Sequence, residues 1–132
     1  MIFLDTSAIY ALANERDPNH EIAVERFGQA IAGREELLVH SYVVVEAAAL
    51  LQARLGIEPS LRFLEQIADF TVHWIDSSDH DSAVSLLRDR GRRELSLVDC
   101  ASFEIMRRYQ VSEALAFDAD FVREGFALYP AR

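Results

Sequence analysis

Short runs of apolar residues alternate along the chain with longer segments whose apolar positions recur every three or four residues. The short runs predict β-strands over 2–5, 36–40, 70–75, 113–118 and 126–130. The longer segments predict helices over 6–14, 18–33, 41–56, 59–69, 77–91 and 96–110. Strands that read as continuous apolar runs between helices are typical of a parallel sheet covered on both faces. The pattern predicts a three-layer α/β/α sandwich with a mostly parallel central sheet, and a single domain over 1–132.

Glu46 lies in the middle of an apolar helical segment. Its helical neighbours, three and four positions away on either side, are Tyr42, Val43, Ala49 and Leu50. Burying an unpaired carboxylate is costly, so a Glu on such a face needs a cation, a hydrogen-bond partner or a functional cleft. We therefore predict that Glu46 is shielded from solvent and functional, with a salt bridge to a distant arginine as the alternative.

Three further carboxylates follow predicted strands or open predicted helices. Asp5 comes directly after the first strand, where a helix N-cap is the ordinary interpretation. Asp99 stands three residues after Ser96, the spacing of a capping box. Asp118 and Asp120 follow the fourth strand, where a turn or a cap explains them equally well. Each residue taken alone has a structural explanation.

Taken together, these positions indicate a shared site. Asp79 and Asp81 are set apart, because they lie in a polar run before a helix and capping explains them. In doubly wound sheets the carboxyl ends of the strands converge on one edge. Carboxylates gathered there repel one another and call for a counter-charge. Oxygen ligands without Cys or clustered His favour Mg²⁺ or Mn²⁺ over zinc. The residues that converge in this way are Asp5, Glu46, Asp99 and Asp118.

Charge and cysteine content narrow the function classes. The formal net charge of -9 argues against a protein that holds nucleic acid by a broad basic surface. Four of the thirteen basic residues, all arginines, fall close together, and we favour a solvated helix end over a phosphate site for them: Arg88, Arg90, Arg92 and Arg93. The lone Cys100 forms neither a disulfide nor a zinc site and reads as an apolar filler. No apolar run is long enough for a membrane span, so we expect a soluble cytoplasmic protein.

Four stretches, in this order and at these spacings, resemble the PIN-domain ribonucleases. They are "MIFLDTSAIYAL", "SYVVVEAAALL", "LSLVDCASFEIM" and "ALAFDADF", which together extend over nearly the whole chain. More narrowly, the chain resembles the VapC-type toxins of prokaryotic toxin–antitoxin pairs. Each motif alone is weak, because an apolar strand ending in Asp is common, but the four in order are fairly specific.

The resemblance implies a Mg²⁺- or Mn²⁺-dependent endoribonuclease acting on RNA. Three acids match metal ligands that bind directly or through water: Asp5, Asp99 and Asp118. Glu46 matches a ligand or a base that orients the attacking water, and Asp120 an accessory acid of the metal site. Ser7 would support Asp5, whereas Ala116 stands where the family often has Thr. The family also implies a cognate antitoxin that blocks the site with an arginine, and a homodimer.

Other functions remain open at this point. Phosphoryl transfer through an aspartyl nucleophile relies on a Lys near the phosphoryl group, and this chain has none. A dinucleotide-binding domain requires a glycine-rich turn after the first strand, which is also missing. A PIN-fold RNA-processing nuclease without an antitoxin and a non-catalytic PIN-fold binding module are the remaining alternatives.

Overall fold

Five parallel strands form the centre of the molecule, which the computed structural model describes for residues 1–131. Their order across the sheet is β3-β2-β1-β4-β5, and all four neighbouring pairs are parallel. The strands are β1 (Ile2–Leu4), β2 (Leu37–His40), β3 (Thr71–His73), β4 (Glu113–Leu115) and β5 (Ala127–Leu128). The first strand of the chain is therefore the central one, with β2 on one side and β4 on the other.

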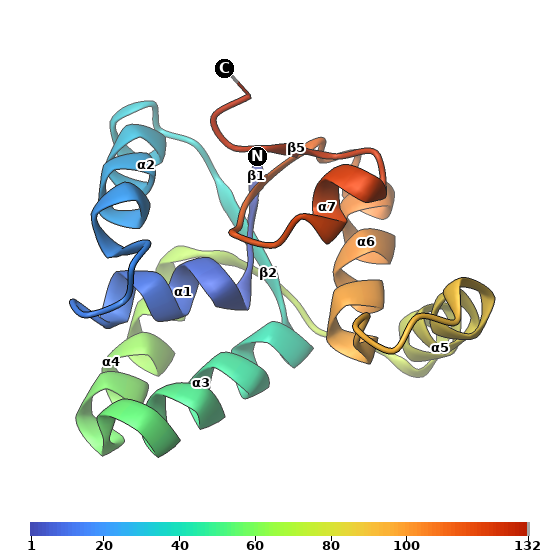
Figure 1. The fold of residues 1–132 in the computed structure, drawn as a ribbon, viewed down its shortest axis with the longest axis horizontal. Coiled ribbons are helices and arrows are strands. Elements are labelled where there is room, and N and C mark those ends of the chain that lie inside the picture. Colours follow the sequence, from blue (N-terminus) through green and yellow to red (C-terminus); the bar gives the residue numbers. More distant parts are fainter. Residues whose placement is uncertain (132) are drawn as a thin grey trace.

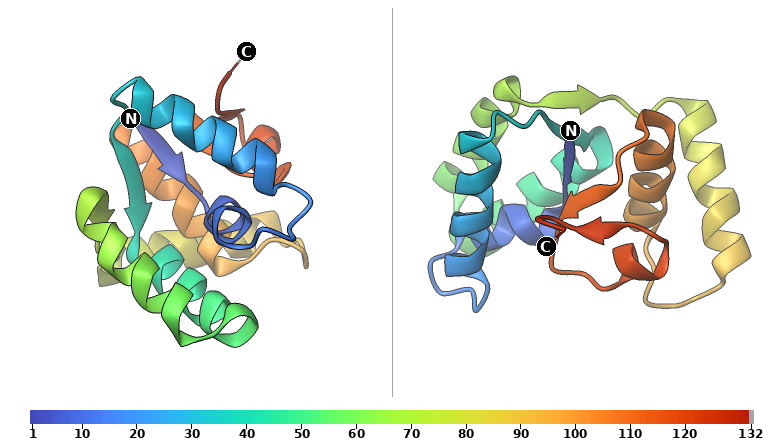
Figure 2. Two further views of the ribbon diagram at one scale, coloured as in Figure 1. Left: turned by 90° about the vertical axis from the view of Figure 1, so that its left-hand side faces the viewer. Right: turned by 90° about the horizontal axis from the view of Figure 1, so that it is seen from above.

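Helices cover both faces of this sheet (Figure 1). One group is α1 (Thr6–Ala13), α2 (His20–Ala32), α3 (Ser41–Leu55) and α4 (Ile57–Gln66), followed by the 3-10 turn η1 (Ile67–Asp69). The other group is α5 (Ser77–Arg90), α6 (Leu97–Tyr109) and the short α7 (Asp120–Arg123). Figure 2 shows the two groups on opposite sides of the strands. The three-layer α/β/α arrangement predicted from the sequence is confirmed.

The central strands are apolar except at their ends, His40 of β2 and Glu113 of β4, because both of their faces are covered. All three residues of β1 are buried, as are all four of β2. Phe3 of β1 packs against Phe121 of α7, and Phe121 meets the edge of Phe103 from α6. Cys100 is fully buried, which agrees with its interpretation as an apolar filler.

The predicted elements agree with the structure apart from their ends. The predicted strand over 126–130 contracts to two residues, and α7 takes the place of the predicted turn after residue 118. Asp79 belongs to a capping box with Asp76, as its polar surroundings predicted, and it also pairs with His73 and Arg108. Within the described residues, no helix is both long and apolar enough to cross a membrane.

Candidate metal centre

Asp5 is held at the junction between β1 and α1. Its backbone N–H donates to the Leu115 carbonyl of β4, and its side chain caps α1. Ser7 donates to Asp5 Oδ2 through its hydroxyl at 2.6 Å and through its backbone N–H at 3.2 Å. The same hydroxyl oxygen accepts from the Phe117 N–H at 3.0 Å. Ser7 thus ties the Asp5 carboxylate to the chain just before Asp118, which confirms the predicted support of Asp5 by Ser7.

Asp99 and Asp118 are also fixed by local backbone geometry. Asp99 opens α6, where its Oδ2 accepts from the Ser96 N–H at 3.0 Å while its own N–H donates to Ser96 Oγ at 3.1 Å. This is the capping box that the sequence predicted. Asp118 follows β4, and its Oδ1 accepts from the Asp120 N–H at 2.9 Å. The local interpretations of these acids are therefore correct.

The same acids nevertheless converge in space. Carboxylate oxygens of Asp99, Asp118 and Asp120 all lie within 4.8 Å of one another. The charges of Asp99 and Asp118 also act on Asp5: burial, with smaller contributions from these charges and against the hydrogen bonds from Ser7, raises the pKa of the Asp5 carboxyl to about 6. Burial also raises the pKa of Asp99, with smaller contributions from the charges of Asp118 and Glu46. We refer to Asp5, Asp99, Asp118 and Asp120 as the acid cluster.

Each member of the acid cluster divides its two oxygens between two environments. One oxygen accepts hydrogen bonds from the protein: Oδ2 of Asp5 and Asp99, and Oδ1 of Asp118 and Asp120. Among residues 1–131, no donor reaches the other oxygen of any of the four. The raised pKa values of Asp5 and Asp99, together with one unused oxygen on each of the four, suit a hard divalent cation, which takes oxygen ligands and neutralises their charge. Capping and metal binding are thus compatible at the same residues.

Glu46 departs from its predicted environment. The prediction that it is shielded is wrong, because Glu46 and its neighbour Val45, which is 65% exposed, lie on the uncovered face of α3. The helix buries Val43, Val44, Ala47 and Leu51 instead. Among residues 1–131, Glu46 makes no hydrogen bond and no salt bridge. Its charge still contributes to the raised pKa of Asp99, although Glu46 is not among the acids whose oxygens lie within 4.8 Å of one another.

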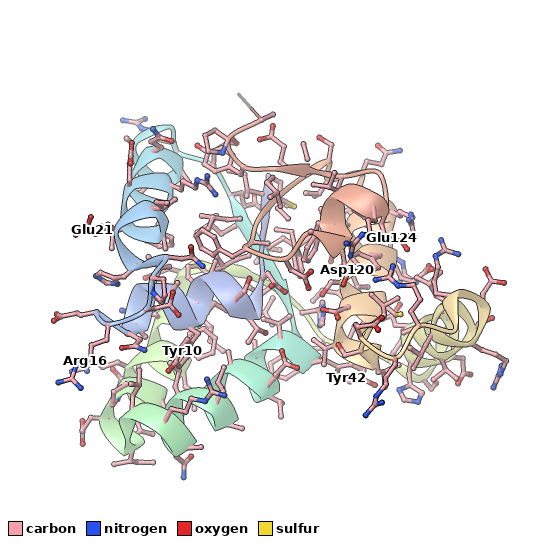
Figure 3. The ribbon with its side chains drawn as sticks, viewed as in Figure 1. Tyr10, Arg16, Glu21, Tyr42, Asp120 and Glu124 are labelled. Atoms are coloured by element: carbon pink, nitrogen blue, oxygen red, sulfur yellow. The ribbon has the colours of Figure 1, made fainter. Side chains whose placement is uncertain are left out.

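The arginine-rich segment is also more ordered than predicted. Arg92 and Arg123 both contact Asp120 Oδ1, and these contacts lower the pKa of Asp120. Arg90 and Arg107 bind the buried Glu124, whose pKa falls to about 2 through these hydrogen bonds and charges. Arg90 and Arg92 thus lie at a solvent-accessible helix end, as predicted, but each also holds a carboxylate of α7 or its C-cap. Asp120 and Glu124 both extend from α7 in Figure 3.

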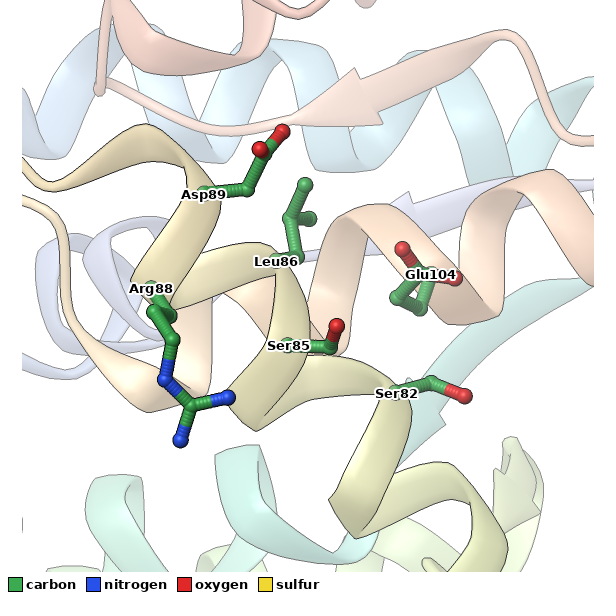
Figure 4. Close-up of a pocket in the computed structure, with 6 residues that line it drawn as sticks. All are labelled: Ser82, Ser85, Leu86, Arg88, Asp89 and Glu104. Atoms are coloured by element: carbon green, nitrogen blue, oxygen red, sulfur yellow. The ribbon is translucent and has the colours of Figure 1, made fainter.

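Arg88 and Arg93 are exposed, as predicted. Arg88 lines a shallow hollow of about 490 Å³ between α5 and α6, together with Ser82, Ser85, Leu86, Asp89 and Glu104 (Figure 4). A larger groove of about 690 Å³ lies between α1, α2, α4 and the sheet. Neither hollow is lined by a member of the acid cluster.

Sequence reasoning missed one buried polar residue at the end of β2, His40. Its Nδ1 accepts from the Val43 N–H at 3.3 Å and so caps α3, while its Nε2–H donates to Ser102 Oγ at 2.8 Å. Ser102 in turn donates to the carbonyl of Val98, the residue before Asp99. Burial lowers the pKa of His40 to about 3, so the imidazole is neutral. A polar residue ending an apolar strand directly before a helix was the available signal.

The fold and the acid cluster together define a class of protein. The chain belongs to the PIN domain family, whose sequence profile matches residues 2–126. The 23S rRNA-specific endonuclease VapC20 of Mycobacterium tuberculosis is 30% identical over 128 residues, which cover 96% of this chain and 95% of VapC20. Ribonuclease VapC26 of the same species is 23% identical over 119 residues, 89% of this chain and 86% of VapC26.

Solved structures agree with this assignment. The crystal structure of M. tuberculosis VapC20, described as a Sarcin-Ricin loop cleaving toxin, superposes with a TM-score of 0.86 at 28% identity, over 96% of this chain and 97% of that one. PAE2754 from Pyrobaculum aerophilum shares the fold with a TM-score of 0.61 at 23% identity, over 96% of this chain and 87% of that one. The resemblance to VapC-type PIN proteins inferred from the four motifs is confirmed.

Proposed function

We propose that this chain is a Mg²⁺- or Mn²⁺-dependent endoribonuclease that hydrolyses RNA phosphodiester bonds, and that it is the toxin of a toxin–antitoxin pair. The similarity to VapC20 makes 23S rRNA the first substrate to test. One observation carries the proposal: oxygens of Asp99, Asp118 and Asp120 lie within 4.8 Å of one another, the charges of Asp99 and Asp118 act on Asp5, and among residues 1–131 each of the four leaves one oxygen without a protein donor.

The acid cluster supplies the ligands in this proposal. Asp99, Asp118 and Asp120 would hold the cation, with Asp5 beside them. A divalent cation held there would lower the pKa of a bound water molecule. It would also stabilise the negative charge that develops on the phosphoryl oxygens. Ser7 keeps Asp5 oriented through the 2.6 Å hydrogen bond to Oδ2, so the other oxygen stays directed away from that anchor.

Glu46 fits the role of proton acceptor better than that of a buried ligand. Its carboxylate is exposed and has no protein partner within residues 1–131, so water can reach both oxygens. The charge of Glu46 contributes to the raised pKa of Asp99, so Glu46 acts on a member of the acid cluster. We assign Glu46 to orienting the attacking water and accepting its proton.

Protein partners form the second part of the proposal. An acid cluster with four carboxylates attracts a guanidinium, so a cognate antitoxin that inserts an arginine would neutralise it and block cation binding. A homodimer is proposed from the family resemblance. Co-purification with the product of a neighbouring gene tests for the antitoxin. Light scattering of the purified protein tests for the homodimer.

The decisive experiment is cleavage of 23S rRNA by the purified protein. We expect cleavage with Mg²⁺ or Mn²⁺, none with chelator, and none with Asp118→Asn. Asp81→Asn is the matched control, because Asp81 is an exposed acid of α5 outside the cluster. Cleavage in chelator would refute the metal mechanism. RNA binding without cleavage under any condition would favour a binding module instead.

A further inference from the structure

Two arginines share one carboxylate oxygen at the edge of the acid cluster. Arg92, from the loop between α5 and α6, and Arg123 of α7 contact Asp120 Oδ1 at 2.5 and 2.7 Å. The Asp120 side chain is 8% exposed, whereas those of Arg92 and Arg123 are 34% and 63% exposed. The carboxylate is therefore inside, and the two guanidinium groups extend from it toward the surface.

These two arginines retain donors and charge that the protein does not use. Arg90, by comparison, directs three nitrogens at Glu124 and Asp89. Arg92 makes one hydrogen bond, and the Glu94 carboxylate at 3.9 Å is beyond hydrogen-bonding distance. Relative to Asp120 alone the two guanidinium groups carry one surplus positive charge, and within residues 1–131 the only further acid that pairs with either is the exposed Glu94, 3.9 Å from Arg92 Nε.

The position of this surplus charge matters for a nucleic-acid substrate. The oxygens of Asp120 lie within 4.8 Å of those of Asp99 and Asp118, so the unused N–H groups stand at the rim of the acid cluster. The chain has a net charge of -9, and its acid cluster repels an approaching phosphodiester. A guanidinium fork matches two phosphate oxygens and remains charged at every working pH.

We infer that Arg92 and Arg123 bind a backbone phosphate of the RNA strand at the rim of the acid cluster, while Asp120 holds both guanidinium groups in place. This inference rests on the proposed nuclease function and adds a substrate-binding role that the acids cannot fill. Asp120 would then serve two purposes: Oδ1 positions the arginines, and Oδ2, which accepts no hydrogen bond within residues 1–131, stays available as a ligand.

The test measures RNA cleavage and RNA binding separately. The variants are Arg92→Ala, Arg123→Ala and Arg92→Lys, with Arg16→Ala as the control, since Arg16 is exposed at the far end of the molecule from Asp120 (Figure 3). KM, kcat and the half-saturating Mg²⁺ concentration are measured on the same RNA. Binding is measured by fluorescence anisotropy in the non-cleaving Asp118→Asn background, over a range of salt concentrations.

We expect Arg92→Ala to raise KM and the dissociation constant about tenfold, because a charge-assisted hydrogen bond to phosphate is lost. The slope of log K against log salt concentration should become shallower by about 0.7 for each arginine removed. Arg92→Lys should recover part of the affinity, and Arg16→Ala should behave as the unmodified protein. If Arg92→Ala fails to fold, Arg92→Gln replaces it, because glutamine can still donate to Asp120 without the charge.

Unchanged KM, binding and salt slope in the Arg92 and Arg123 variants would overturn the inference, and a change in Mg²⁺ dependence alone would show that the arginines serve only Asp120. If the unmodified protein cleaves no RNA, the proposed function fails while the binding measurement still decides the arginine role. Absence of RNA binding in the Asp118→Asn background would refute that role as well.

Discussion

Replacing Asp5 with Asn is expected to abolish RNA cleavage and, at the same time, to stabilise the metal-free protein. Asp5 is 5% exposed, and its pKa rises from 3.8 to about 6 chiefly because burial disfavours the ionised form. Asparagine keeps the helix cap, since its side-chain oxygen accepts from the Ser7 N–H as Asp5 Oδ2 does. The substitution thus removes a buried charge and leaves its structural contact in place.

The size of the stabilisation expected from Asp5→Asn follows from the pKa of the Asp5 carboxyl. A carboxyl that titrates at about 6 in the folded chain and at 3.8 in the unfolded chain is ionised more easily after unfolding. Below pH 4 this carboxyl does not change the free energy of unfolding. Between pH 4 and pH 6 it lowers the free energy of unfolding progressively, and above pH 6 the destabilisation is complete. A shift of about 2 pKa units corresponds to about 3 kcal/mol, which sets the upper limit of the gain from Asp5→Asn.

Urea unfolding in the presence of chelator measures this difference at several pH values. The two proteins should have similar free energies of unfolding at pH 4, and Asp5→Asn should be more stable by about 2–3 kcal/mol at pH 7.5. Asp81→Asn, at an exposed position of α5, should show no comparable gain. A gain of the same size at pH 4 and pH 7.5, or a loss at pH 7.5, would refute the assignment of a buried, destabilising charge to Asp5.

Three further predictions concern the cation, the anchor of Asp5 and the buried histidine. Mg²⁺ at one hundred times its dissociation constant should raise the free energy of unfolding by about 2.7 kcal/mol, and Asp118→Asn should abolish this gain in thermal melts. Ser7→Ala should lower kcat about tenfold and the free energy of unfolding by about 1–2 kcal/mol, because the hydroxyl bonded to Asp5 and Phe117 is lost; unchanged cleavage rates would contradict this. Burial lowers the pKa of His40 to about 3, so the unfolded chain binds a proton below pH 6.5 that the folded chain does not. His40 should therefore cost about 2 kcal/mol of stability between pH 7 and pH 5, opposite in sign to the gain from Asp5 over that range, and the difference in free energy of unfolding between the unmodified protein and His40→Asn should change by about that amount in urea titrations.

The sequence predicted the positions of the acidic residues correctly where local backbone geometry determines those positions. Asp5 and Asp118 could be placed because each follows an apolar strand, and the ends of neighbouring parallel strands lie at one edge. Asp99 could be placed because the capping box with Ser96 fixes the start of α6. The three acids meet because these local rules agree with the strand order.

Contacts between distant segments could not be predicted in the same way. An apolar helix such as α3 does not reveal which of its faces the neighbouring helices cover, and so the exposure of Glu46 was missed. The Arg92–Asp120 contact joins residues 28 positions apart, and the His40–Ser102 hydrogen bond joins residues 62 apart. Both depend on how α5, α6 and α7 pack, which no local pattern encodes.

The strand order also has a consequence for synthesis of the chain on the ribosome. The central strand β1 is translated first, but its neighbour β4 comes late, and the Ser7–Phe117 hydrogen bond joins residues 110 positions apart. At translation rates of about 5–20 residues per second, Phe117 is added to the chain roughly 5 to 20 seconds after Ser7. A nascent chain that already contains Asp5 lacks the Leu115 carbonyl that accepts from the Asp5 N–H until β4 emerges, and a chain interrupted before Asp118 is expected to be inert toward RNA.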